Sequence, residues 1–100
     1  MSAVFRLKDA EPIEVSESWD LERQIADAAQ WLDEPKNGDR VRGSTLDIGF
    51  NCRLSDRVAV QGETVPVEFM RRLVSLEITL WLSIYPPFSD PAAQTASPLP

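Results

Sequence analysis

The chain has 100 residues, of which 43% are hydrophobic and 26% charged, and its formal net charge at pH 7 is −6. This length fits one domain that can bury a core. Histidine is absent and Cys52 is the only cysteine, which excludes Ser-His-Asp and Cys-His catalysis, the common zinc sites and an internal disulfide.

The same composition bears on where the protein works. No apolar run approaches the ~20 residues that a membrane-spanning helix needs. The first residues lack the continuous apolar stretch of a signal peptide, and the single cysteine fits a reducing compartment. We therefore expect a cytoplasmic protein that needs no cofactor, binds no metal and does not contact a membrane.

The acidic excess is concentrated in one segment. Residues 9–34 contain nine acidic residues and one basic residue, Arg23, whereas residues 35–100 contain seven of each sign. Such a field repels nucleic acid phosphates and attracts basic proteins. A run of acids is also the ordinary composition of a solvated helix face, so both interpretations remain open.

The first half of the chain predicts strands followed by a helix. Residues 4–8 predict a short strand with Phe5 and Leu7 on one face and Arg6 and Lys8 on the other, and residues 13–15 are a weaker candidate for an edge segment. Ser18 is expected to cap a helix over about residues 19–33. One apolar stripe at helical spacing forms its expected buried side: Leu21, Ile25, Ala28 and Leu32.

Pro35 is expected to end this helix, and the turn-forming residues after it predict a loop to about Ser44. The clearest pattern follows. Over residues 46–53 every even position is apolar or Cys and every odd position is polar or Gly, which predicts a half-buried strand with one wet face. Residues 58–60 are a candidate short strand.

Pro66 and Glu68 suit the first turn of a second helix, which is expected to end near Leu76. The last strand, over residues 78–85, alternates apolar side chains on one face with Trp81 and other side chains on the opposite face. Residues 86–100 hold five of the eight prolines and predict a disordered tail after a single domain of residues 1–85.

These elements predict an α+β fold: a two-layer sandwich of an antiparallel or mixed sheet with two helices on one face. Their order, strand-helix-strand-strand-helix-strand, is that of the ferredoxin-like split βαβ arrangement. That topology places the third strand centrally, and here the third candidate, 58–60, is the weakest. A sheet in which 46–53 lies beside 78–85 fits the patterns better.

Three short motifs carry a resemblance to known proteins. They are Leu46-Asp47-Ile48-Gly49-Phe50, Pro66-Val67-Glu68 and Leu82-Ser83-Ile84-Tyr85. With the preceding amphipathic helix, they make residues 19–85 resemble a family of small bacterial domains of unknown function. The resemblance implies an α+β fold without an established activity, and some members of the family resemble immunity proteins that are encoded beside toxins.

The acidic helix is the first candidate binding surface. Asp20, Glu22 and Asp27 are expected to dock a basic toxin, enzyme or regulator. Neither Asp47, which has no second carboxylate nearby in the sequence, nor Cys52, which alternates inward with Phe50, is expected to be catalytic.

The wet face of the last strand is the second candidate surface. Trp81 and Tyr85 there offer a platform for a small molecule, a peptide or a second copy of the chain. Cross-strand packing, with Trp81 lying over Gly49, is the alternative.

We therefore expect a non-catalytic protein-binding module, an immunity or inhibitor protein that docks a basic protein partner through residues 9–34. The alternative is a domain that binds a small molecule or peptide, or pairs as a homodimer, through the Trp81/Tyr85 face. Nucleic acid is not an expected partner.

Overall fold

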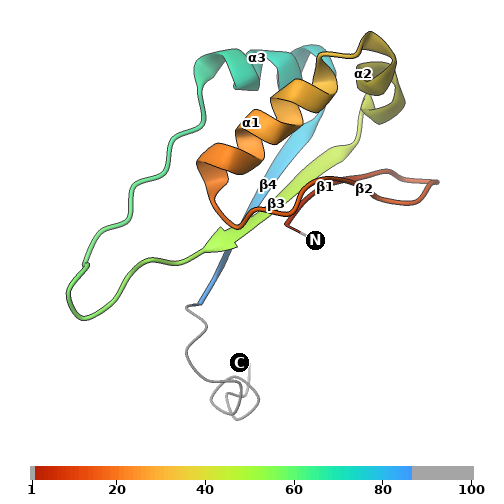
Figure 1. Cartoon of the computed structure of the whole chain (residues 1–100). Helices are drawn as coiled ribbons and strands as arrows, with labels where there is room; N and C mark the ends of the chain where they lie inside the picture. The colour runs from red at the N-terminus through yellow and green to blue at the C-terminus, as the bar shows by residue number, and fades with distance from the viewer. Residues whose placement is uncertain (1, 87–100) are drawn as a thin grey trace.

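The computed structural model describes residues 2–86, which form four strands and three helices (Figure 1). In chain order these are β1 (Ala3–Arg6), β2 (Ile13–Ser16), α1 (Leu21–Leu32), α2 (Pro35–Val41), β3 (Thr45–Asn51), α3 (Val67–Ser75) and β4 (Thr79–Tyr85). The fold is α+β, as the sequence predicts. The expected disordered tail, apart from residue 86, lies outside the described residues.

The four strands form one mixed sheet in the order β2-β1-β3-β4. β1 pairs antiparallel with both β2 and β3, and β3 pairs parallel with β4 from Thr45–Thr79 to Asn51–Tyr85. The expectation that residues 46–53 lie beside 78–85 is therefore confirmed. The ferredoxin-like order does not form, because residues 58–60 lie outside any strand and the hairpin β1–β2 occupies that side of the sheet.

The core lies between one face of the sheet and the helices. The inward side chains of β3 are Leu46, Ile48 and Phe50, each at most 2% exposed. They pack against the predicted apolar stripe of α1, in which all four residues are buried, and against Phe69 and Leu73 of α3. The two strongest periodicities in the sequence are thus confirmed as the buried sides of β3 and α1.

The first helix begins two residues later than the sequence suggests. Asp20 has extended backbone angles, and its carboxylate accepts a hydrogen bond from the Arg23 N–H at 3.2 Å. The Ser18 hydroxyl instead accepts from the Asp20 N–H at 3.1 Å. The expectation that Ser18 caps this helix is therefore wrong: Ser18 orders the approach, and Asp20 is the N-cap.

Residues 36–41, expected to be part of a loop, continue as the second helix. Pro35 both ends α1 and begins α2, because a proline in the first turn of a helix loses no hydrogen bond. The Asn37 amide donates to the Trp31 carbonyl at 2.9 Å, and Val41 is fully buried. The prediction of a loop is therefore wrong, because the turn-forming residues Asn37, Gly38 and Asp39 lie within a helix here.

The third helix turns one side toward α1. Arg72 donates to the Ala29 carbonyl at 3.2 Å and forms an ion pair with Asp33 at 3.1 Å. Arg72 does not pair with Glu68, one turn earlier on the same helix, because its long side chain reaches α1 instead. This contact fixes the rotation of α3 about its own axis.

Candidate functional site

The face of the sheet opposite the helices carries an aromatic group near the ends of β3 and β4. The ring of Tyr85 meets Trp19 edge-on, with centroids 5.4 Å apart and planes at 90°. The Trp81 indole N–H donates to the Ser83 hydroxyl at 2.9 Å. The three rings remain accessible, at 42% for Trp19, 48% for Tyr85 and 61% for Trp81. No sequence pattern links Trp19 to this group, because it precedes α1 and lies far from β4 along the chain.

Tyr85 also has a packing role. A Cβ placed on Gly49 would collide with the Tyr85 ring, so the ring lies directly over this glycine of the neighbouring strand. The expectation that Trp81 covers Gly49 is therefore wrong, because Tyr85 leans back along the strand to fill that space. Of the two predicted aromatic residues, Tyr85 packs against the neighbouring strand and Trp81 is the more exposed.

The structure separates the three predicted docking acids. Asp27 accepts a hydrogen bond from the Ser16 hydroxyl at 2.7 Å and pairs with Arg23 at 3.0 Å, so it ties α1 to β2. Asp20 caps α1. Glu22 alone is exposed with no hydrogen bond or ion pair to any other residue in 2–86. Glu22 is therefore the freest of the three to meet a partner.

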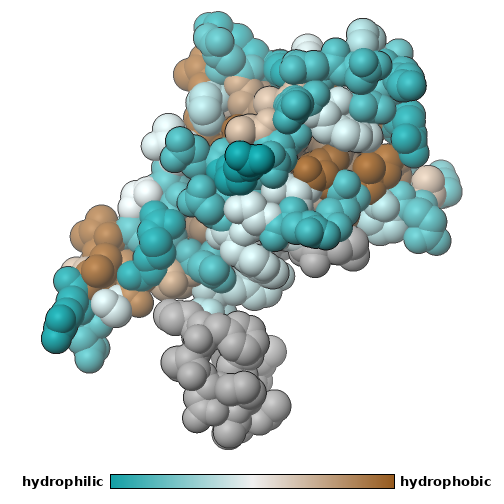
Figure 2. Space-filling model, viewed as in Figure 1, coloured by the Kyte–Doolittle hydropathy of each residue, from teal (hydrophilic) through white to brown (hydrophobic). Residues whose placement is uncertain are grey.

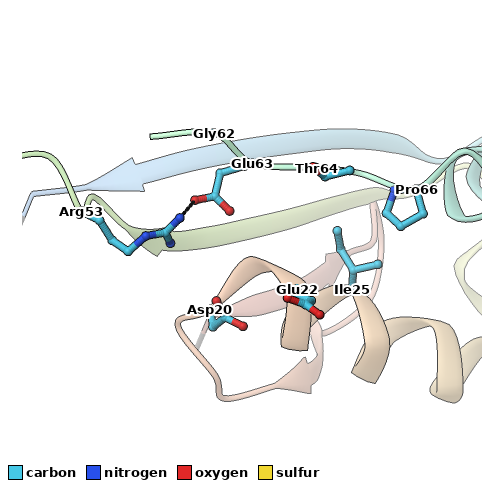
Figure 3. Close-up of a pocket in the computed structure, with 8 residues that line it drawn as sticks. All are labelled: Asp20, Glu22, Ile25, Arg53, Gly62, Glu63, Thr64 and Pro66. Atoms are coloured by element: carbon cyan, nitrogen blue, oxygen red, sulfur yellow. Dashed lines mark hydrogen bonds and ion pairs between the residues drawn. The ribbon is translucent and has the colours of Figure 1, made fainter. Parts of the chain in front are cut away.

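Asp20 and Glu22 face a cleft of about 510 Å³ between the start of α1 and residues 62–66 (Figure 3). Across the cleft, Arg53 and Glu63 form an ion pair at 2.6 Å. Ile25 is the apolar residue that α1 adds to the lining. Because the Arg53–Glu63 pair neutralises itself, the two α1 carboxylates leave the cleft negatively charged.

The other acids of residues 9–34 extend this negative surface around α1 and the β1–β2 hairpin. The exposed ones are Asp9, Glu11, Glu14, Glu17, Asp33 and Glu34. Figure 2 shows mostly hydrophilic side chains on this view of the molecule. The hydrophobic patch at its lower left lies on the segment between β3 and α3, which carries Leu54, Val58 and Val60.

Groups suited to catalysis are engaged elsewhere. The Asp47 carboxylate pairs with Arg6 on the neighbouring strand at 2.7 Å. The sulfur of Cys52 accepts a weak hydrogen bond from the Leu54 N–H at 3.4 Å. Within residues 2–86, no group of three or more His, Cys, Asp or Glu side chains is arranged to hold a metal ion.

One buried polar residue was missed by the sequence interpretation. Gln24 is fully buried within the apolar side of α1, and its amide donates to the carbonyls of Gly49, at 2.6 Å, and Ser2, at 3.2 Å. Since β1 begins at Ala3, the Gln24 amide supplies hydrogen bonds to these two carbonyls just before the β1–β3 pairing starts. It supports the backbone beneath Tyr85 from the opposite face of the sheet.

Comparisons with known proteins supply no family. No protein-family model matches the chain, and neither a search of curated proteins nor a search of solved structures finds a match. In the described part of the chain, no helix has the length and apolar character that a membrane crossing requires.

Proposed function

We propose that the protein is a non-catalytic binding module of the immunity- or inhibitor-protein kind, which docks a basic partner protein through its acidic side. The observation that carries the proposal is the confinement of charge. The segment with nine acids and one base forms β2, α1 and the turns beside them. β2 lies at one edge of the sheet, and the Asp27–Ser16 hydrogen bond joins it to α1.

A confined negative surface of this kind favours a basic protein in two ways. It raises the rate of encounter by electrostatic steering, and it fixes the orientation in which the partner arrives. Glu22, at the mouth of the cleft, is placed to accept charge-assisted hydrogen bonds from an arginine or lysine side chain. Asp20 beside it adds charge while capping α1.

The test uses acids that the fold does not need. Glu11 and Glu22 are both exposed and form no internal hydrogen bond or ion pair within the described residues, so the double variant Glu11→Lys/Glu22→Lys should fold. Glu68→Lys makes the same exchange once, on α3 and outside the acidic segment, so it changes the charge by +2 where the double variant changes it by +4. It is the control for positive charge added elsewhere on the protein.

Wild-type protein and both variants are used to capture partners from lysate of the native host, with elution in a salt gradient. We expect wild type and the Glu68 control to retain one basic protein in stoichiometric amount, released by moderate salt because screening weakens the attraction. The double variant should lose it. Equal recovery by wild type and double variant would overturn the proposal.

A second candidate function rests on the open face of the sheet. Trp19 and Tyr85 are in contact there, Trp81 lies further back along the same face of β4, and each ring is at least 42% exposed, a suitable surface for a peptide or a small aromatic ligand. Trp81→Ala should abolish this binding and leave the charge-driven binding nearly intact. Capture experiments with this variant therefore separate the two functions.

A further inference from the structure

β4 is the outermost strand of the sheet, and one of its edges is open. The Thr79 N–H donates to the Ser44 carbonyl at 3.0 Å, and the Tyr85 carbonyl accepts from the Cys52 N–H at 2.8 Å. Odd positions of β4 thus direct their backbone groups to β3, and even positions direct theirs outward. No backbone hydrogen bond within residues 2–86 meets these outward groups, which belong to Leu80, Leu82 and Ile84.

This edge lacks the features that normally protect an open strand. Thr79–Tyr85 contains no charged residue and no proline. On the side that faces the helices, Leu82 is 42% and Ile84 62% exposed. The reason is length: α3, with nine residues, spans about 13 Å at the start of β4, whereas seven strand residues span about 23 Å.

α3 exposes a second apolar surface beside the same edge. Since Arg72 points to α1, the opposite side of α3 points away from α1, beyond β4. That side carries three apolar side chains at helical spacing: Val67, Met70 and Val74, which are 54%, 41% and 74% exposed. The strand edge and this stripe of α3 together form what we call the β4 edge surface.

We propose that the β4 edge surface binds a second copy of this chain, with the two β4 strands paired antiparallel about a two-fold axis at Leu82. In this register Leu82 faces Leu82 of the second copy, and Leu80 faces the second copy's Ile84. All three even positions then become hydrogen-bonded pairs, giving about six backbone hydrogen bonds. The result is one continuous eight-stranded sheet built from the two four-stranded sheets.

The same symmetry covers the exposed apolar side chains. The second copy's α3 lies over the start of its own β4, and the axis places that start beside the end of the first copy's β4. The outward stripe of the second helix therefore lies over Leu82 and Ile84 of the first strand. Each copy supplies the apolar cover that the other copy's strand lacks.

Charge favours this edge over the others for self-association. A chain with net charge −6 repels its copies, but the acids of residues 9–34 lie on β2, on α1 and on the segments beside them, and none of them belongs to α3 or β4. Residues 67–85 contain two acids and two bases and are neutral. The five exposed apolar side chains offer on the order of 500 Å² per copy against about 800 Å² in a standard interface, so we expect micromolar affinity.

Sedimentation velocity of the whole chain, over roughly two orders of magnitude in concentration around the micromolar range, tests the proposal. We expect wild type to pass from monomer to dimer. Leu82→Lys, which opposes two ammonium groups at the axis, and Ile84→Lys should each weaken the dimer at least about tenfold. Val60→Lys, at a residue 81% exposed in the segment before α3, is the control and should still dimerise.

The register has its own test, in a Cys52→Ser background so that no other thiol is present. Leu82→Cys places two thiols across the axis with Cα atoms about 5.5 Å apart, a spacing that a disulfide spans, so mild oxidation should give a covalent dimer. Ile84→Cys is the control. In this register the Cα atoms of the two introduced cysteines lie about 14 Å apart, so no disulfide should form between them.

Circular dichroism establishes that each variant is folded before it is compared. A wild type that stays monomeric over the whole concentration range overturns the proposal, as does a dimer that survives both lysine variants. Equal cross-linking of the two cysteine variants overturns the register. None of these outcomes depends on the acidic docking proposed above, which is tested by other residues.

Discussion

Tyr85 has two neighbours that give it different roles. Its ring covers Gly49 and meets Trp19 edge-on, so it links the last strand to the segment before α1 across β3. A glycine weakens a strand because it supplies no side chain to pack, and an aromatic ring from the adjacent strand restores that packing. The open face is thus partly a packed layer and only partly a free surface.

Gly49→Ala should move Tyr85 and reduce its contact with Trp19. The methyl group collides with the ring, and the strain of about 1–3 kcal/mol exceeds the 0.5–1 kcal/mol that an alanine recovers from the unfolded chain. We expect a net loss of about 1 kcal/mol in urea unfolding, with a change in tryptophan fluorescence. Gly62→Ala, whose Cβ would meet nothing within 4 Å, is the control and should not destabilise.

Gln24 and Trp19 show what a sequence pattern leaves out at this scale. The apolar stripe of α1 was predicted correctly, but helical spacing gives no sign that a glutamine on the same side is buried with it. Its burial depends on two backbone carbonyls, of Ser2 and Gly49, that become neighbours only in the folded sheet. The contact between Trp19 and Tyr85 likewise joins residues that are far apart in the chain.

Helices and strands were predictable where the pattern was local and strong. The alternation over residues 46–53 needs no knowledge of the partner strand, because one face of the strand is buried in any arrangement. α2 was missed because Pro35 ends one helix and suits the first turn of another equally well. Residues 58–60 resemble a strand but have no strand beside them to pair with.

The start of α1 gives a prediction at the scale of the element. Asp20→Ala removes the side chain that accepts the Arg23 N–H, and it should lower the free energy of unfolding by about 1 kcal/mol. Ser18→Ala leaves that hydrogen bond in place and should lower the free energy of unfolding by less. Chemical denaturation of the two variants checks the assignment, and a larger loss for Ser18→Ala would show that the helix begins earlier.

At the scale of the whole molecule, the sheet order separates two kinds of surface. The acidic segment forms β2, α1 and the turns beside them, whereas the neutral β4 edge surface is formed by α3 and by the strand at the opposite edge of the sheet from β2. The sequence shows that the acidic excess is confined to one segment. It does not show at which edge of the sheet that segment lies, because this depends on β1 pairing with β3, about forty residues further along the chain. The sequence also does not predict that β4 is an edge strand. Its alternation of apolar and polar side chains would be the same in an edge strand and in a central strand.

Confined like charges predict how stability responds to salt. Repulsion among the exposed acids of residues 9–34 opposes folding, and ions screen it. Raising NaCl should therefore stabilise the protein by on the order of 1 kcal/mol, a rise of roughly 4–8 °C in Tm. Glu11→Lys/Glu22→Lys relieves part of the repulsion, so its Tm should rise less with salt. Equal salt responses of wild type and variant would contradict this explanation.

The position of β4 at the end of the domain has a consequence for synthesis of the chain. β1, β2, α1 and β3 are complete at residue 51, and 34 more residues must follow before β4 is complete. At about 5–20 residues per second, β3 waits several seconds on the ribosome with its side toward β4 unpaired. The synthesis of α3 and β4, rather than any property of β3, therefore determines when this side of β3 becomes paired.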